Sequence, residues 1–107
     1  MAGSVLNMIG LARRAGHVES GDAAVRSAVD RGKVILLILA EDAAERTRRA
    51  FGRLAGDAGI PLISCGTKED LGKILKKPAR SVVAITDKNF ARGIVGALER
   101  GGAKLGQ

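Results

Sequence analysis

Residue types that many catalytic and metal sites require are scarce in this sequence. Its 107 residues include one cysteine, one histidine, two phenylalanines and neither tryptophan nor tyrosine. The single cysteine, Cys65, excludes an internal disulfide and suits a reducing compartment. It cannot form a zinc site with His17 alone, and we expect a strand-end thiol and a turn histidine rather than a catalytic pair. The scarcity of aromatic rings also argues against RNA modules that work by stacking bases.

Phosphate loops, membrane spans and secretory signals are missing as well. Neither glycine-rich phosphate loop, G-x-x-x-x-G-K-[ST] or G-x-G-x-x-G, occurs, so nucleotide-dependent catalysis lacks its usual phosphate cradle. The longest apolar run, residues 34–40, is too short to span a membrane, and residues 1–4 do not begin a secretory signal. We therefore expect a cytoplasmic protein without a cofactor, a bound metal or a membrane partner.

Positive charge, in contrast, is plentiful. Lysine and arginine number 18 against 11 aspartates and glutamates, which gives a net charge of +7 and an isoelectric point of about 10.3. An excess of this sign is typical of proteins that bind polyanions, and it concerns electrostatics rather than fold. The excess is shared by both halves of the chain. Any basic patch must therefore be formed by folding rather than by a basic tail.

Apolar periodicity predicts strands that alternate with helices. Strands are expected at residues 34–40, 60–64 and 81–85. Helices are expected to begin at five sites rich in capping residues or glycine, which are Ser4, Ser20–Asp22, Asp42–Glu45, Thr67, and Asp87 or Asn89. We predict one α/β domain over residues 1–107, a three-layer α/β/α sandwich with a small mixed sheet of about four strands. Residues 101–107 are expected to form a frayed tail.

An acidic pair, Glu41 and Asp42, follows the most apolar strand, where α/β sheets normally place their ligands. Together with Asp87, which follows a later strand, the pair defines one hypothesis, a small Mg²⁺-dependent enzyme. Capping explains these aspartates as well, and we expect Asp42 to cap the next helix. For the four arginines of that helix a solvated outer face is the commoner explanation. They are Arg46, Arg48, Arg49 and Arg53.

Six segments carry a resemblance to a known family. They are Leu11–Gly16, Ala28–Gly32, Ala40–Asp42, Gly59–Pro61, Thr67–Gly72 and Val83–Ile85. In order and spacing they resemble the kink-turn RNA-binding ribosomal-protein superfamily, in particular its small bacterial YlxQ-like branch. The resemblance extends over nearly the whole chain. It implies an α/β/α sandwich that binds kink-turns, which are sharply bent RNA duplexes with an internal loop flanked by sheared G·A pairs.

In this family the N-terminal end of the second helix enters the RNA groove. The family's glycine at that point corresponds to Gly21, but Ala23, Ala24 and Ser27 stand at the positions of the family's Asn, Glu and Lys. Backbone N–H groups at a helix start can still hold phosphate, whereas alanine cannot read a base. The resemblance therefore implies intact phosphate contacts and reduced base contacts.

The candidate RNA-binding residues belong to the second helix, the turn after the apolar strand, and the basic positions and loop before the third predicted strand. In chain order they are Gly21, Asp22, Ala23, Arg26, Ser27, Arg31, Lys33, Glu41, Asp42, Lys68, Lys76, Lys77, Pro78, Ala79 and Arg80. We expect a non-catalytic, monomeric RNA-binding protein associated with the ribosome or translation. Its partners would be kink-turn or ribosomal RNA and ribosomal proteins. The alternative is a protein-interaction module of the same fold that has lost kink-turn specificity.

Overall fold

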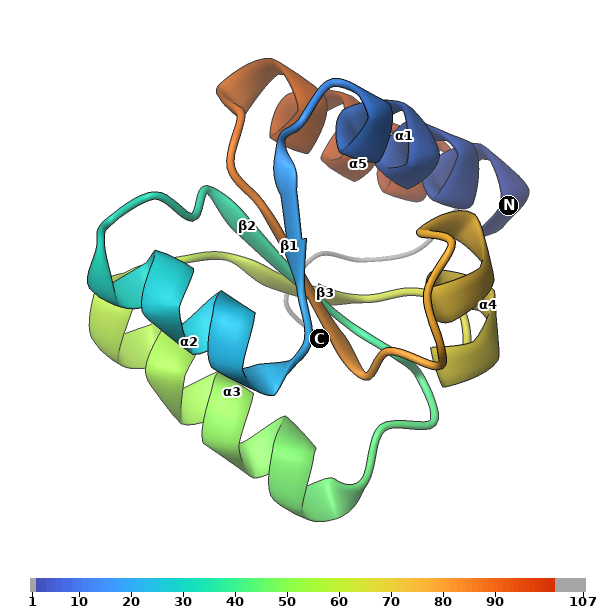
Figure 1. Cartoon of the computed structure of the whole chain (residues 1–107). Helices are drawn as coiled ribbons and strands as arrows, with labels where there is room; N and C mark the ends of the chain where they lie inside the picture. Colours follow the sequence, from blue (N-terminus) through green and yellow to red (C-terminus); the bar gives the residue numbers. More distant parts are fainter. Residues whose placement is uncertain (1, 102–107) are drawn as a thin grey trace.

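Five helices and four strands make up residues 2–101, the part of the chain described by the computed structural model (Figure 1). In chain order they are α1 (Ala2–Arg14), β1 (Val18–Ser20), α2 (Asp22–Asp30), β2 (Leu36–Leu39), α3 (Glu45–Ala58), β3 (Leu62–Ser64), α4 (Lys68–Ile74), β4 (Val82–Ile85) and α5 (Lys88–Arg100). Strands and helices therefore alternate as predicted. The predicted frayed tail, residues 101–107, lies outside the described residues except for Gly101.

The four strands form one mixed sheet in the order β1-β4-β2-β3. β4 is antiparallel to both of its neighbours, with Ile85 opposite Val18 of β1 and Leu36 of β2, whereas β2 and β3 are parallel. As a result, β1, β2 and β3 end, and β4 begins, at the same end of the sheet. We call this the Gly21 end, because Gly21 directly follows β1. The other is the His17 end, because His17 directly precedes β1.

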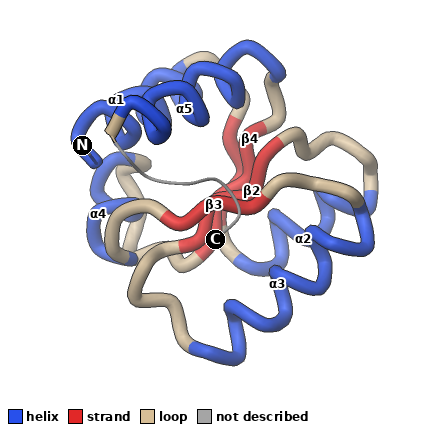
Figure 2. Tube along the Cα trace, turned by 180° about the vertical axis from the view of Figure 1, so that it is seen from behind, coloured by secondary structure: helices blue, strands red, loops and turns tan. Residues whose placement is uncertain are grey.

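Helices cover both faces of the sheet (Figures 1 and 2). On one face α1, α4 and α5 bury Ile9, Leu71 and Ile94, and on the other α2 and α3 bury Val25 and Phe51. Every residue of the inner strands β2 and β4 is buried, which explains why the residues of β2 show no alternation of apolar and polar side chains. The predicted α/β/α sandwich with a four-stranded mixed sheet is thus confirmed. No helix within residues 2–101 has the length and apolar character needed to cross a membrane.

Two of the predicted helix caps are confirmed. Thr67 caps α4 in a complete capping box, in which its hydroxyl accepts from the Asp70 N–H and the Asp70 carboxylate accepts from the Thr67 N–H, each at 3.0 Å. Asp87 caps α5 by accepting a hydrogen bond from the Phe90 N–H at 2.9 Å. Both caps are local in sequence, so the residue pattern alone was enough to predict them.

Two predicted capping residues, Ser4 and Asp42, are wrong. Ser4 lies inside α1, which begins earlier. Among the three candidate caps of α2 the structure selects Gly21, and Ser20 belongs to β1, a strand that the sequence does not predict. Asp42 does not cap α3, because that helix begins at Glu45. The Asp42 carboxylate instead accepts a hydrogen bond from the Lys68 N–H at 2.8 Å, across 26 positions of the sequence. Its contact is therefore tertiary rather than local.

Candidate nucleic-acid interface

A hollow of about 270 Å³ opens at the Gly21 end of the sheet. Its walls are residues 21–22 at the start of α2, Thr47 in the first turn of α3, and residues 79–82, which lead into β4. Arg80 is fixed at this wall, because its Nε donates a hydrogen bond to Ser20 Oγ at 3.2 Å. The structure thus brings together the start of α2 and the end of the basic loop, two segments that are predicted separately to bind RNA.

The start of α2 has no side-chain cap. Gly21 adopts φ 90° and ψ 156°, a conformation essentially restricted to glycine, and its N–H donates to the Val82 carbonyl at 3.2 Å. The first bond within the helix runs from the Val25 N–H to the Gly21 carbonyl, and none of the described side chains caps the helix before it. Free N–H groups and the positive end of the helix dipole make such a start favourable for an anion.

The start of α3 borders the same hollow and is also uncapped. Its N-cap residue is Ala44, whose side chain has no acceptor, and the first bond within the helix runs from the Arg48 N–H to the Ala44 carbonyl. Thr47 of this first turn lines the hollow. Two positive helix ends and the guanidinium of Arg80 therefore border one hollow, an arrangement suited to a phosphate group.

Asp22 and Arg26 form an ion pair on α2. Arg26 Nε donates to Asp22 Oδ1 at 2.6 Å, and the Arg26 guanidinium lies 4.8 Å from the centre of the Phe51 ring of α3. The pair offsets the negative charge that Asp22 adds beside the hollow. Arg26 is therefore held between α2 and α3, while Ala23 and Ser27 are exposed without a charged group of their own.

The basic loop before β4 is attached to α4 by backbone bonds. The Arg80 N–H donates to the Lys68 carbonyl at 3.0 Å, and the Lys68 N–H donates to Asp42, so three predicted residues form one chain of hydrogen bonds. The loop also passes close to Gly72, where an added Cβ would lie 2.5 Å from a loop carbonyl oxygen. Residues 76–79 of the loop are exposed to solvent. The loop therefore presents its cations from a backbone that is fixed to α4.

Arg48 is not part of a solvated face, contrary to the prediction for the arginines of α3. Its Nη2 donates to the carbonyls of Ala40 at 3.1 Å and Glu41 at 2.8 Å, and its Nη1 donates to Ser64 Oγ at 3.4 Å. The Glu41 N–H in turn donates to the Gly66 carbonyl at 2.7 Å. The turn after β2, a predicted RNA-binding segment, is therefore tied to the end of β3 by its own backbone groups.

Two predicted residues lie away from the hollow. Arg31 and Lys33 follow the C-terminal end of α2, which at 1.5 Å per residue is about 13 Å from Gly21. Arg31 Nε donates to the Ser27 carbonyl at 3.3 Å, and both cations are exposed. The structure therefore does not bring them together with Arg80.

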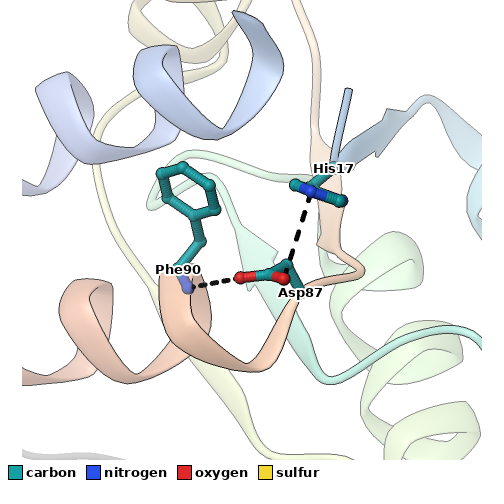
Figure 3. A network of polar contacts seen from close by, with 3 residues as sticks. All are labelled: His17, Asp87 and Phe90. Carbon is teal, nitrogen blue, oxygen red and sulfur yellow. Dashed lines mark hydrogen bonds and ion pairs between the residues drawn. The ribbon is translucent and has the colours of Figure 1, made fainter. Parts of the chain in front are cut away.

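Asp87 lies at the His17 end, so it cannot join Glu41 and Asp42 in the Mg²⁺ site of the enzyme hypothesis. β2 and β4 are antiparallel, and Asp87 therefore lies at the opposite end of the sheet from Glu41 and Asp42. Figure 3 shows the Asp87 carboxylate between two groups. One oxygen accepts the capping hydrogen bond from the Phe90 N–H, and the other, Oδ1, lies 4.0 Å from His17 Nε2. Among residues 2–101 no group of three potential ligands comes together for a metal ion.

Cys65 and His17 are also separated by the length of the sheet. Cys65 follows β3 at the Gly21 end and is buried, and His17 precedes β1 at the other end. Burial raises the pKa of the Cys65 thiol, and the negative charges of Glu41 and Asp70 raise it further. A neutral, buried thiol is a poor nucleophile, which agrees with the expected structural role.

Two residues of the site are not predicted from the sequence. They are Ser20, the partner of Arg80, and Thr47, which lines the hollow. Both contacts join segments that are distant in sequence, 60 positions apart in the case of Ser20 and Arg80. The three-residue strand β1 carries no pattern that could have revealed its place beside β4. One feature of the sequence could have indicated that α3 borders an anion site. Ala43 and Ala44 precede this helix, and neither has a side chain that could cap its N-terminal N–H groups.

Comparison with known proteins identifies similar chains over almost the same length. The model of the ribosomal protein L7Ae/L30e/S12e/Gadd45 family matches residues 4–95. RNA-binding protein YlxQ of Bacillus subtilis (strain 168) is 32% identical over 92 residues, which are 86% of this chain and 92% of the relative. The protein of the same name from Enterococcus faecium is 28% identical over 87 residues, 81% of this chain and 84% of the relative.

Two solved structures have the same fold. A protein of unknown function from Bacillus halodurans C superposes with a TM-score of 0.83 at 32% identity, covering 89% of this chain and 96% of the other. The 15.5 kD RNA-binding protein of Giardia lamblia superposes with a TM-score of 0.74 at 25% identity, covering 91% and 86%. These matches confirm the predicted resemblance, and the names of the relatives agree with the prediction of a non-catalytic protein.

Proposed function

This chain belongs to the ribosomal protein L7Ae/L30e/S12e/Gadd45 family, and we propose that it is a non-catalytic RNA-binding protein that recognises the bent shape of kink-turn duplexes. The hollow at the Gly21 end is the observation that carries this proposal. Two uncapped helix starts and Arg80 border it, and the exposed stretch 76–79 of the basic loop extends from it. The relatives named as RNA-binding proteins support RNA as the ligand.

Phosphate contacts are assigned to the backbone N–H groups at the start of α2, to Arg80 and to Lys68. Gly21 has no side chain between its backbone and the ligand, and the nearest heavy atom to an added Cβ would be Arg80 Nε at 3.9 Å. A strand of phosphates can therefore approach the helix start closely. Because such contacts position a nucleic acid without reading its bases, they suit recognition of a backbone bend.

Base readout is reduced in this proposal. Ala23 and Ser27, at the positions of the family's Asn and Lys, are exposed, and Ala24 is half-buried. Alanine offers neither a donor nor an acceptor to a base edge, and serine carries no charge. We therefore assign selectivity chiefly to the shape of the duplex, with ribosomal or other structured RNA as the source of the kink-turn.

The test is a titration of the protein into a kink-turn duplex that carries one fluorophore on each stem, without added Mg²⁺. A matched duplex has its sheared G·A pairs replaced by Watson–Crick pairs. The proposal predicts tight binding with a rise in energy transfer for the kink-turn and weaker binding without bending for the control. Each titration is repeated at two salt concentrations, because phosphate contacts make affinity depend on salt.

Two results would contradict the proposal. Equal, strongly salt-sensitive binding to both duplexes would indicate general phosphate affinity without recognition of shape. Absence of binding to either duplex, together with salt-insensitive binding to a protein partner, would favour a protein-interaction module on the same fold.

A further inference from the structure

A second hollow, of about 360 Å³, lies between α1 and the end of α4. Its lining includes the amide of Asn7 and three cations, Arg13, Arg14 and Lys76, and no carboxylate. Within the described part of the chain, no carboxylate forms a salt bridge with any of these three cations. Arg13 Nε is buried without a hydrogen-bond partner among the same residues. Like charges that line one hollow repel each other, and an anion between them would remove the repulsion.

Lys76 has a strained backbone at the edge of this hollow. Its φ is 60°, and it is the one non-glycine residue with positive φ in the described chain. The Lys77 N–H donates to the Gly72 carbonyl at 2.9 Å and the Lys76 N–H donates to the Lys73 carbonyl at 3.1 Å. This pair of bonds is the Schellman motif, which places the residue after the C-cap in the left-handed region and usually has glycine there.

Three other helices of the same chain follow that rule. α1, α2 and α3 each end with the same pair of bonds, and the left-handed residue is Gly16, Gly32 and Gly59 respectively. Among the described residues, only the fourth motif has a side chain in this conformation, and that side chain is a lysine that lines the basic hollow. Glycine at this position would stabilise the helix end more than lysine does. Another property of Lys76 therefore has to explain its presence.

We propose that this hollow is a second phosphate-binding surface, which holds the backbone of the RNA stem beyond the kink. This inference rests on the proposed function and extends its contact area. One loop joins the two hollows, since Lys76 lines the second and Arg80 lines the first. The two cations are four positions apart in the sequence, so their Cα atoms are at most about 14 Å apart. A few successive phosphates of one strand span that distance.

Two variants test the second surface, Lys76→Gly and Arg14→Gln, in titrations with the doubly labelled kink-turn duplex. Lys76→Gly is expected to raise the melting temperature by about 2 to 8 °C, because it relieves the left-handed strain. It is also expected to weaken RNA binding about two- to fivefold and to lower the slope of log affinity against log salt by about 1. Arg14, which is exposed, should show the same loss in binding with an unchanged melting temperature.

Arg53→Gln is the matched control, because Arg53 is an exposed helical arginine of α3 on the opposite face of the sheet, and it should leave binding unchanged. Arg80→Gln reports on the first hollow. Normal binding by Lys76→Gly and Arg14→Gln, with a loss in Arg80→Gln, would overturn the second surface and leave the proposed function intact. Failure of the unchanged protein to bind the kink-turn would overturn both.

Discussion

Replacement of Gly21 by alanine should destabilise the fold although there is space for the added methyl group. The new Cβ would meet only Arg80 Nε at 3.9 Å, an ordinary contact, so steric overlap contributes nothing. The backbone, however, has φ 90° and ψ 156°, a region that is essentially closed to residues with a Cβ. We therefore expect the whole effect to come from conformational strain at the junction of β1 and α2.

The size of the effect follows from two opposing contributions. A residue held in such a region costs about 1 to 3 kcal/mol. Alanine also restricts the unfolded chain, which offsets this cost by about 0.4 to 1 kcal/mol. The midpoints of these two ranges predict that the free energy of unfolding falls by about 1.3 kcal/mol, which lowers the melting temperature by about 5 to 10 °C in a domain of this size.

Gly52→Ala is the matched control for the same chemical change. Gly52 lies inside α3, and an added Cβ would meet nothing within 4 Å. Alanine there should raise the free energy of unfolding by about 0.5 to 1 kcal/mol, because glycine is unfavourable within a helix. Urea unfolding of both variants, followed by circular dichroism, measures the difference. Equal stability of the two variants would refute the strain that we assign to Gly21.

Three further predictions concern Arg48, Cys65 and Ser27. Arg48→Met should lower the free energy of unfolding by about 1 to 3 kcal/mol, because two backbone carbonyls lose a charged donor. Arg49→Met is the control. It removes only an exposed ion pair with Glu45 and should cost at most about 0.5 kcal/mol in the same unfolding assay. The raised pKa of Cys65 predicts that the free energy of unfolding falls as the pH rises above 9.0, the ordinary pKa of a thiol, since only the unfolded state then releases the proton. If a Cys65→Ala variant shows the same fall over this range, the Cys65 thiol is not its cause. Ser27→Lys should strengthen binding to the kink-turn duplex and steepen its salt dependence by about one phosphate contact, and unchanged titrations would place the exposed face of α2 outside the interface.

Local residue patterns were sufficient to predict most elements of this fold. The capping box of Thr67 and Asp70 lies within four residues, and the buried strand β2 appears as an unbroken apolar run. Left-handed Gly59 ends α3, and a glycine directly after an apolar helical stripe is a local stop signal. In each of these cases the signal lies in consecutive residues of the element itself, so it can be recognised without knowledge of the tertiary structure.

Tertiary contacts determined what could not be predicted. β1 exists because Val18 and its neighbours pair with β4, more than sixty positions away. Asp42 was expected to cap the helix that follows it, but its carboxylate holds Lys68 of α4. Arg48 shares a helix with exposed arginines, yet its guanidinium binds the ends of two strands. No local pattern distinguishes these residues from ordinary caps or surface charges.

The candidate site shows the same division. The resemblance pointed to Gly21 and to the loop that contains Arg80, and the fold brings these two residues to one hollow. Arg31 and Lys33 were assigned to the same surface, but the length of α2 separates them from it. Which cations lie together depends on strand order and helix direction, and neither can be derived from charge counts along the sequence.

The most direct test of the central claim is the mapping of backbone amide signals by nuclear magnetic resonance while kink-turn RNA is added to the protein. We predict that the largest shifts occur at the Gly21 end, in residues 21–24, Thr47 and residues 76–81. The amides of Asp87 and Phe90 at the other end should remain unchanged. Shifts concentrated at the His17 end would contradict the assignment of the RNA interface to the Gly21 end of the sheet.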